Sequence, residues 1–319
     1  MNGRANLEAF AEGRQCSAIV CETGLGKLQT MMRIARNIFL VIAAFCVSVC
    51  VGCARLHDEF RQKNDPSADQ TPQISISPES PHLGFGNPSN ATQEPKNDDN
   101  YLIVGEGSVF SYNNSRGTVN WVSWKTTRAD LGEKRERPDF QPDPRLPNWY
   151  VRIGYYDYSG SGYDRGHMVP SADRFADPRL NEGTFMMTNI VPQTGALNQY
   201  PWNLFEMYVR SQVRRGFDAY QIAGVYGDKG RLKGKVTVPT NCWKVVAFLP
   251  KGRTADYIDA RMRIIAVDMP NIDGIEGEPW EKYKTSIRAI EEKTGFDFFA
   301  AMPRELQDEI EIKTETRNR

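Results

Sequence analysis

The pattern of apolar and polar residues predicts six strands along the C-terminal part of the chain. Three segments rich in aromatic and β-branched residues come first, at residues 101–104, 108–112 and 120–125. The run 113–117 between the last two has the composition of a turn. Three later apolar segments have the length of buried strands, at residues 219–225, 243–249 and 261–267.

Two helices are predicted after these strands. In residues 279–292 the apolar side chains fall three and four positions apart, and Gly295 lies just past the end. Residues 303–312 predict a last helix, and the chain has no internal repeat. This mixture of strands and helices predicts one α+β domain over residues 99–319.

The N-terminal part of the chain has a different composition. Residues 31–53 carry two arginines near their start, at positions 33 and 36. An apolar stretch too short for a comfortable membrane span follows, and then small residues, as in a secretory signal peptide. Residues 54–98 are rich in Pro, Ser, Asn, Gln and Asp, which predicts a disordered linker. Residues 1–30 precede the signal, so we expect an unstructured extension or a translation start at Met31 or Met32.

The end of the signal, Val51-Gly52-Cys53, resembles a bacterial lipobox in which Cys53 would carry the lipid. Cys50 stands where a leucine is usual, so a plain cleaved signal and an uncleaved anchor remain alternatives. We expect an exported protein that is extracellular, periplasmic or membrane-anchored as a lipoprotein.

Charge and cysteine content narrow the function classes. Forty Lys and Arg residues balance forty Asp and Glu residues, which excludes a basic coat over the whole chain but leaves room for a local basic groove. Five of the six cysteines precede residue 54, so Cys242 is alone in the predicted domain. This excludes both a disulfide-stapled domain and a zinc site of four cysteines there.

His167 is the first candidate for chemistry. It is the only histidine after residue 82, and a neutral imidazole accepts a proton near pH 7. Arg165, two residues earlier, offers a charged planar fork suited to phosphate, and Asp164 could orient that cluster. Gly166 and the neighbouring glycines let the backbone approach another group closely. The alternative is a hydrogen-bonded histidine with a structural role.

A second candidate group follows on a predicted helix. Asn198, Trp202, Glu206 and Arg210 are spaced by four, which places them on one slowly drifting stripe. Asn198 and Glu206 offer the oxygen ligands that Mg²⁺ prefers, and Arg210 can pair with Glu206. Pro201 is tolerated if the helix begins near Asn198. The alternative is an amphipathic helix with one surface ion pair.

The two groups together fit hydrolysis of a phosphodiester. His167 would activate a water, a divalent cation on Asn198 would bridge phosphate and leaving group, and arginines would neutralise developing charge. One asparagine is a weak anchor, so the remaining ligands of Mg²⁺ would be waters and a substrate oxygen.

The segment Asp164-Arg165-Gly166-His167 resembles the signature of the DNA/RNA non-specific endonucleases, the ββα-metal group that includes secreted bacterial nucleases and mitochondrial endonuclease G. The similarity continues through residues 188–193 and then Asn198, Trp202 and Glu206. It extends over about residues 83–300, including the runs 111–117, 120–124, 233–239 and 294–298. The resemblance implies a ββα-metal nuclease fold with a mostly antiparallel central sheet and helices on both sides.

The resemblance also implies a role for each matched residue. His167 matches the general base, Asn198 matches the sole protein ligand of a catalytic Mg²⁺ (or Mn²⁺), and Glu206 matches an acidic residue that holds metal-bound water. The other matches are Arg165 and Arg210 as phosphate-positioning arginines, Asn189 as a polar residue lining the site, Asp164 as a supporting residue, and Arg137 or Arg135 as a further arginine, with Arg137 preferred. Such nucleases cut DNA and RNA without base specificity and leave 5′-phosphate ends.

Two other functions remain open at this point. One is a phosphodiesterase with a narrow substrate on the same scaffold, and the other is an inactive nucleic-acid-binding surface protein. A protein inhibitor is compatible with the resemblance, but the sequence identifies none.

Overall fold

The computed structural model describes residues 80–315. The predicted extension, the signal peptide, Cys53 and residues 54–79 of the predicted linker lie outside the described residues, as do residues 316–319. No helix within the described residues is long and apolar enough to span a membrane.

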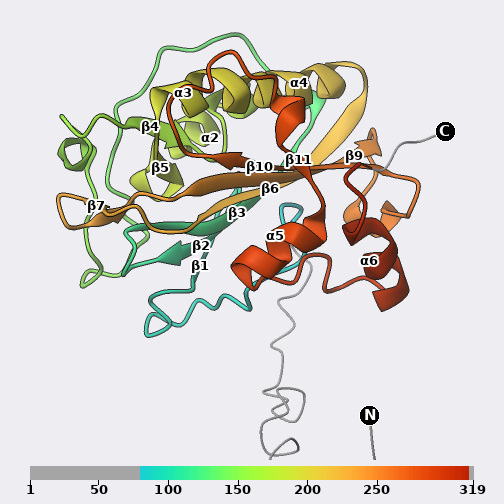
Figure 1. The fold of residues 1–319 in the computed structure, drawn as a ribbon, viewed down its shortest axis with the longest axis horizontal. Helices are drawn as coiled ribbons and strands as arrows, with labels where there is room; N and C mark the ends of the chain where they lie inside the picture. The colour runs from blue at the N-terminus through green and yellow to red at the C-terminus, as the bar shows by residue number, and fades with distance from the viewer. Residues whose placement is uncertain (1–79, 316–319) are drawn as a thin grey trace, which may run out of the picture. The chain divides into compact units, whose positions relative to one another are not determined.

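A seven-stranded sheet forms the centre of the domain (Figure 1). Its order is β1-β2-β3-β6-β9-β10-β11, and every neighbouring pair is antiparallel. The strands are β1 Tyr101–Val104, β2 Val109–Asn113, β3 Thr118–Thr126, β6 Phe217–Tyr226, β9 Asn241–Pro250, β10 Arg263–Pro270 and β11 Lys284–Thr285. Two small sheets flank it, β4 Asp164–His167 with β5 Ile190–Gln193, and β7 Arg231–Leu232 with β8 Val236–Thr237.

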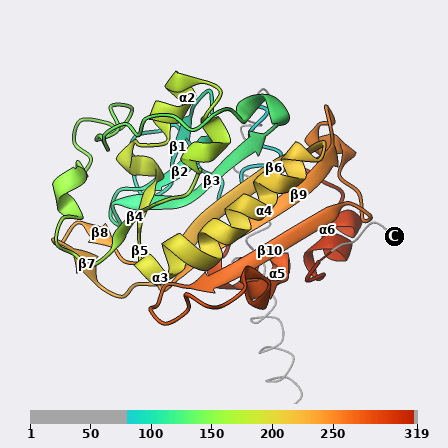
Figure 2. The same ribbon diagram turned by 90° about the horizontal axis from the view of Figure 1, so that it is seen from above.

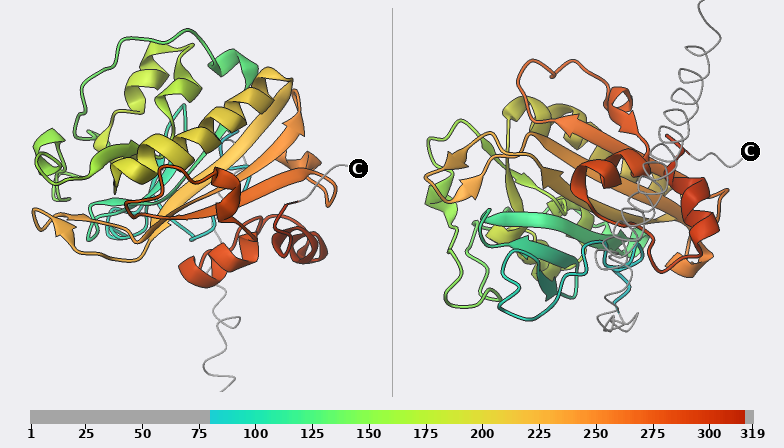
Figure 3. Two further views of the ribbon diagram at one scale, coloured as in Figure 1. Left: turned by 45° about the horizontal axis from the view of Figure 1, so that its top comes forward. Right: turned by 60° about the horizontal axis from the view of Figure 1, so that its bottom comes forward.

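Helices cover both faces of the central sheet, as predicted. The helix α4 (Asn203–Arg214) lies along one face, with α2 (Pro178–Gly183) and α3 (Gly195–Leu197) on the same side (Figures 1 and 2). The helices α5 (Ile287–Thr294) and α6 (Arg304–Glu311) lie on the opposite face (Figure 3). Because both faces are covered, the central strands are buried over nearly their whole length.

Strict alternation assigns each side chain of the central strands to one face. In β9, Trp243 and Val245 belong to the apolar cluster under α5 and α6, whereas Cys242 and Val246 belong to the cluster under α4. Lys244 therefore points toward α4, although it stands in an otherwise apolar strand. Three α4 residues, Phe205, Val209 and Val213, fall four apart and fill the same cluster.

Residues 80–98 show that the predicted linker boundary at residue 98 is wrong. Phe85 is fully buried and its ring lies 4.6 Å from that of Phe299. Ser89 accepts a 2.7 Å hydrogen bond from the indole of Trp121, and the Asn87 side chain bonds the backbone of Ala91 at both ends. The composition of this segment is that of a loop, but the segment is ordered. Its polar side chains form hydrogen bonds within its own turns, and its few apolar side chains pack in the core.

The helix predicted over residues 279–292 is also partly wrong. A 3₁₀ turn, Trp280–Tyr283, is followed by β11, and α5 begins only at Ile287, where the Ser286 side chain caps it by accepting from Ala289 N. Trp280 packs in the cluster under α4, whereas Ile287 packs under α5. The chain crosses the sheet edge between them, so the regular spacing does not belong to one helix. Gly295, at φ 73°, ends α5 as predicted.

Candidate active site

His167 ends β4, one strand of a short hairpin-like pair. The register sets His167 opposite Ile190 and Asp164 opposite Gln193. Gly166 is required there because a Cβ atom at this position would lie 1.9 Å from the Gln193 side-chain oxygen. The sequence prediction of a close approach is therefore confirmed at Gly166.

The His167 imidazole has an apolar surround and an unused nitrogen. The Phe185 ring meets it edge-on at 4.8 Å, and the Phe140 ring lies 5.5 Å away. The Nε2 atom is buried and has no hydrogen-bond partner in the described part of the chain. Burial, and then repulsion from Arg137, lowers the pKa of His167 to about 3. The ring is therefore neutral at pH 7, and the same environment makes it a weaker base than a free imidazole.

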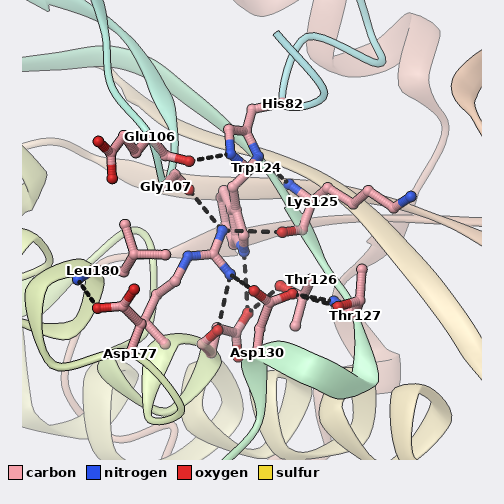
Figure 4. Close-up of polar contacts among 12 residues, drawn as sticks. His82, Glu106, Gly107, Trp124, Lys125, Thr126, Thr127, Asp130, Asp177 and Leu180 are labelled. Carbon is pink, nitrogen blue, oxygen red and sulfur yellow. Dashed lines mark hydrogen bonds and ion pairs between the residues drawn. The ribbon is translucent and has the colours of Figure 1, made fainter.

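His82 shows the alternative role that sequence reasoning left open. Its Nδ1 accepts from Lys125 N at 3.1 Å, and its Nε2 lies 2.6 Å from the Glu106 carbonyl (Figure 4). Both ring nitrogens of His82 thus serve the fold. His167 differs because one nitrogen has no such partner.

Two of the predicted arginines share the Phe140 ring with His167. The guanidinium carbon of Arg137 lies 5.0 Å from its centre and that of Arg165 lies 5.7 Å from it. Arg165 also rests on the Tyr155 ring at 3.8 Å. Arg135 is held elsewhere, by the carbonyls of Phe175 and Ala176. The structure therefore brings Arg137, rather than Arg135, beside His167.

Asn189 is placed differently from the prediction. It was expected to line the site, but it is fully buried. Its Oδ1 accepts from Val169 N at 2.9 Å, and its Nδ2 donates to the Val169 and Thr184 carbonyls. With both ends used, Asn189 fixes the backbone immediately after His167 rather than facing a substrate.

The helix that carries Asn198 begins earlier than predicted. Thr194 caps it by accepting from Leu197 N, so the first helical residue is Gly195. The segment Asn198–Trp202 is π-helical and contains Pro201, and α4 continues from Asn203. The wider turn accommodates a proline that lies beyond the first turn, where a regular helix would be broken.

A hydrogen bond ties Asn198 to β4. Its Nδ2 donates to Asp164 Oδ2 at 2.9 Å, and Gln199 Nε2 donates to the same oxygen at 2.9 Å. This fixes the amide so that Oδ1, the atom a hard cation would bind, points away from Asp164. Asp164 thus joins the strand of His167 to the helix of Asn198.

Glu206 and Arg210 belong to a buried charged cluster rather than to a surface ion pair. Arg210 Nη1 lies 3.1 Å from Asp173 Oδ1 and 3.8 Å from Glu206 Oε2. Lys244 Nζ lies 3.3 Å from Glu206 Oε1 and 4.3 Å from the centre of the Trp202 ring. We call Asp173, Glu206, Arg210 and Lys244 the α4 cluster.

The pKa directions in the α4 cluster follow burial and hydrogen bonding. Burial raises the pKa of Glu206, and Lys244 and Arg210 oppose that rise. Burial also acts on Asp173, but Arg210 and the Trp124 indole outweigh it and lower its pKa. Asp173 accepts from four side chains, namely Trp124, Thr126, Gln221 and Arg210. A full set of donors therefore keeps Asp173 charged.

Sequence reasoning missed Asp173 and Lys244. Lys244 left a signal, because a lysine in the middle of the apolar run 242–249 needs a buried partner. Asp173 left none, since it lies three residues after Pro170 in an ordinary turn sequence.

The residues present fit a divalent cation. Asn198 offers an oxygen held in place by Asp164, and Glu206 lies two helical turns further along. A cation with one protein ligand would complete its shell with water and substrate. The group Glu291, Asp297 and Glu311, the one cluster of three potential metal-binding side chains among the described residues, belongs instead to α5, α6 and the intervening loop.

Two antiparallel strands followed by a helix, with a histidine on the first strand and an asparagine near the start of the helix, are the arrangement found in the ββα-metal class of nucleases. The model of the DNA/RNA non-specific endonuclease family matches residues 86–305. The chain belongs to that family and is an endonuclease. Such enzymes typically depend on a divalent metal.

Relatives agree with this assignment. A nuclease of Nostoc sp. (strain PCC 7120 / SAG 25.82 / UTEX 2576) is 41% identical over 274 residues, covering 85% of this chain and 96% of its own. Human mitochondrial endonuclease G is 32% identical over 210 residues, covering 60% and 67%. The solved complex of EndoG with EndoGI, described as revealing the mechanism of EndoG inhibition, matches with a TM-score of 0.55 and 25% identity, covering 64% of this chain and 88% of that one.

Proposed function

We propose that this endonuclease hydrolyses both DNA and RNA with His167 as general base and one Mg²⁺ ion held by Asn198. The observation that carries the proposal is the hydrogen bond from Asn198 to Asp164, three residues before His167 on the same strand. It joins the candidate base and the candidate ligand in one ββα unit. The match to the non-specific endonuclease family supports the same conclusion.

In the proposed reaction, neutral His167 takes a proton from a water molecule that attacks the phosphorus atom. The bond from phosphorus to the 3′ oxygen breaks, so the phosphate stays on the 5′ end. A divalent cation at Asn198 supplies positive charge that stabilises the phosphate and the departing oxygen. Arg137 and Arg165 lie on the His167 side, where their fixed charges would neutralise the phosphate oxygens.

In this proposal the α4 cluster would form the other side of the site. Asp173 anchors Arg210 and Lys244 anchors Glu206, so neither Arg210 nor Glu206 moves freely. Mutual pairing also limits the energetic penalty of burying these four charges. A rigid Glu206 would orient water near the departing oxygen, which then takes up a proton.

Cleavage assays on the full chain test the proposal. Plasmid DNA and RNA should both be cut in Mg²⁺ and neither in EDTA. His167→Ala should lower kcat by roughly 10²–10⁴-fold, the usual contribution of a general base. His82→Gln is the matched control, because both nitrogens of His82 serve the fold, and we expect its kcat to remain near wild type in the folded fraction.

Asn198→Ala tests the ligand separately, since it should raise the Mg²⁺ concentration needed for half-maximal activity. An unchanged metal requirement would refute the assignment of Asn198. Cleavage of only one polymer would favour the narrow phosphodiesterase, and binding without cleavage would favour the inactive surface protein.

We further propose that the enzyme is exported and that Cys53 carries a lipid. The support is the sequence of residues 31–53 alone. Mass spectrometry of the mature N-terminus should find a lipidated Cys53. A free new N-terminus would indicate plain secretion, and intact residues upstream of Met31 would contradict the predicted translation start.

A protein inhibitor is also proposed, supported by the solved EndoG complex with EndoGI. Pull-down from the producing cell with the His167→Ala variant tests this.

A further inference from the structure

A strongly exposed tyrosine pair lies next to the candidate active site. Tyr155 and Tyr156 form a 3₁₀ turn with Asp157. Tyr156 is 78% exposed and Tyr155 is 46% exposed, and their rings meet edge-on at 5.5 Å. Nothing in the core requires the Tyr156 ring, which leaves its aromatic face open to solvent.

Arg165 connects this turn to the strand of His167. Its guanidinium carbon lies 3.8 Å from the centre of the Tyr155 ring, and its Nη2 donates to the Tyr155 carbonyl at 2.8 Å. It also donates to Ser159 Oγ at 3.2 Å. The position of the turn is therefore tied to Arg165, two residues before the candidate base.

A basic hairpin tip supports the turn from the other side. Lys233 Nζ donates to the Tyr156 carbonyl at 2.5 Å, and Lys235 Nζ pairs with Asp157 at 3.0 Å. Lys233 adopts φ 46° in the tight connection between β7 and β8. Two exposed lysines and one arginine thus hold the turn that carries the exposed Tyr156 ring.

We infer that the turn Tyr155–Asp157 with Lys233, Lys235 and Arg165, here called the tyrosine platform, binds one unpaired nucleotide beside the scissile phosphate. Positive side chains on the same turn as an open aromatic ring match the charge and the flat face of a nucleotide. In a duplex the faces of the bases are covered by their neighbours, so only a base turned out of the stack could lie on Tyr156. The inference deepens the proposed function and rests on it.

The platform makes a prediction about substrate class. Stacking on Tyr156 should favour single-stranded or distorted nucleic acid over regular duplex. It should not favour a particular base, because every base has an aromatic face. The preference belongs to the step of binding, so it should appear in KM more than in kcat.

The test compares oligonucleotide binding by full-chain variants in EDTA, where no cleavage occurs. Fluorescence anisotropy would follow a labelled oligothymidine strand and a labelled hairpin duplex. Tyr156→Ala should weaken binding of the single strand by roughly 5- to 100-fold, the range for loss of one stacked base, and binding of the duplex by less than about threefold. Tyr156→Phe keeps the ring and should restore single-strand binding.

Tyr257 provides the matched control. It also lies in a 3₁₀ turn, is 40% exposed and has the Arg253 guanidinium 4.5 Å from its ring centre. Tyr257→Ala should leave both affinities unchanged. Equal binding of the single strand by wild type and Tyr156→Ala would overturn the platform and leave that surface to another partner, such as a protein.

The two proposals fail in different ways. A chain that cuts neither polymer but loses single-strand affinity in Tyr156→Ala would refute the hydrolytic proposal and keep the platform. If wild type and Tyr156→Ala both cut DNA and RNA with the same KM, the platform would be refuted and the hydrolytic proposal would stand.

Discussion

Two buried groups of carboxylates pack against opposite faces of the central sheet, and they balance their charge differently. The α4 cluster sets Asp173 and Glu206 against Arg210 and Lys244, two acids against two bases. The second group, here called the C-terminal cluster, lies where α5 meets α6. There Arg288 serves both Glu291 and Glu311, at 3.6 Å and 2.8 Å.

The pKa values follow this difference. In the α4 cluster the pKa of Asp173 is lowered, because Arg210 and other donors overcome the effect of burial. In the C-terminal cluster burial, and then the charge of Glu291, raises the pKa of Glu311 to about 7. A buried acid thus stays charged where its donors are sufficient and holds a proton where they are not. The same change of acid to amide should therefore have opposite effects at Asp173 and at Glu311. Glu206, whose pKa is raised by burial in spite of Lys244 and Arg210, does not share the behaviour of Asp173.

Asp173→Asn should give the largest effect. The amide keeps the shape of the side chain but leaves Arg210 buried without its closest counter-charge. We expect a loss of about 3–5 kcal/mol in the free energy of unfolding, as is usual when one partner of a buried pair is removed. Urea denaturation at pH 7 measures it.

Asp259→Asn is the control for that change, because Asp259 pairs with the exposed Arg261 at the surface. The free energy of unfolding of this variant should fall by less than about 0.5 kcal/mol. Equal losses in the two variants would mean that the α4 cluster does not depend on charge balance.

Lys244→Met should give a smaller loss, of about 1–3 kcal/mol, because removing Lys244 also removes a buried charge whose own desolvation was unfavourable. Glu206 would then keep only Arg210, at 3.8 Å. A double-mutant cycle with Glu206→Gln isolates the contact between Lys244 and Glu206. We expect a coupling of about 1 kcal/mol or more, and additive losses would show that the 3.3 Å approach is energetically unimportant.

Local pattern was sufficient for the six long strands of the central sheet and for α6, because side chains alternate in a strand whatever lies beside it. Which helix packs on which face of each strand was not predictable in the same way. Lys244 faces α4 only because β9 pairs with β6 and β10 in the middle of the sheet, and these pairings join segments far apart in the chain. The interruption of the predicted helix 279–292 at residues 284–286 could not be predicted for a similar reason, since β11 forms only by pairing with β10.

The candidate site was predictable where residue type alone carries the chemistry. His167 and Asn198 were found because few residues can serve as a base or an oxygen ligand near that signature. Asp173 was not found, because its importance comes from four donors on other elements. Asn189 was found but given the wrong place, since only the fold shows that both ends of its amide bond the backbone.

Glu311→Gln should give the smallest effect, and of opposite sign to Asp173→Asn at pH 8. Glu311 has a folded-state pKa of about 7, above its ordinary value of 4.5. The folded state therefore binds more protons at Glu311 between these values. The contribution of Glu311 to stability is fully present below pH 4.5 and is lost as pH rises through 7. Glutamine resembles the protonated acid, so the variant should lose less stability than the wild type as pH rises. We expect the variant to be more stable than the wild type at pH 8 by about 1 kcal/mol.

Thermal unfolding from pH 4 to pH 8 tests this sign. Glu309→Gln is the control, because Glu309 lies on the same helix but is 56% exposed and pairs with Lys313. Its unfolding curve should follow the wild type at every pH. Since the C-terminal cluster lies across the sheet from His167, kcat of Glu311→Gln should equal that of wild type in the folded fraction. A variant destabilised at pH 8 would show that Glu311 is charged there, with Arg288 sufficient for both acids.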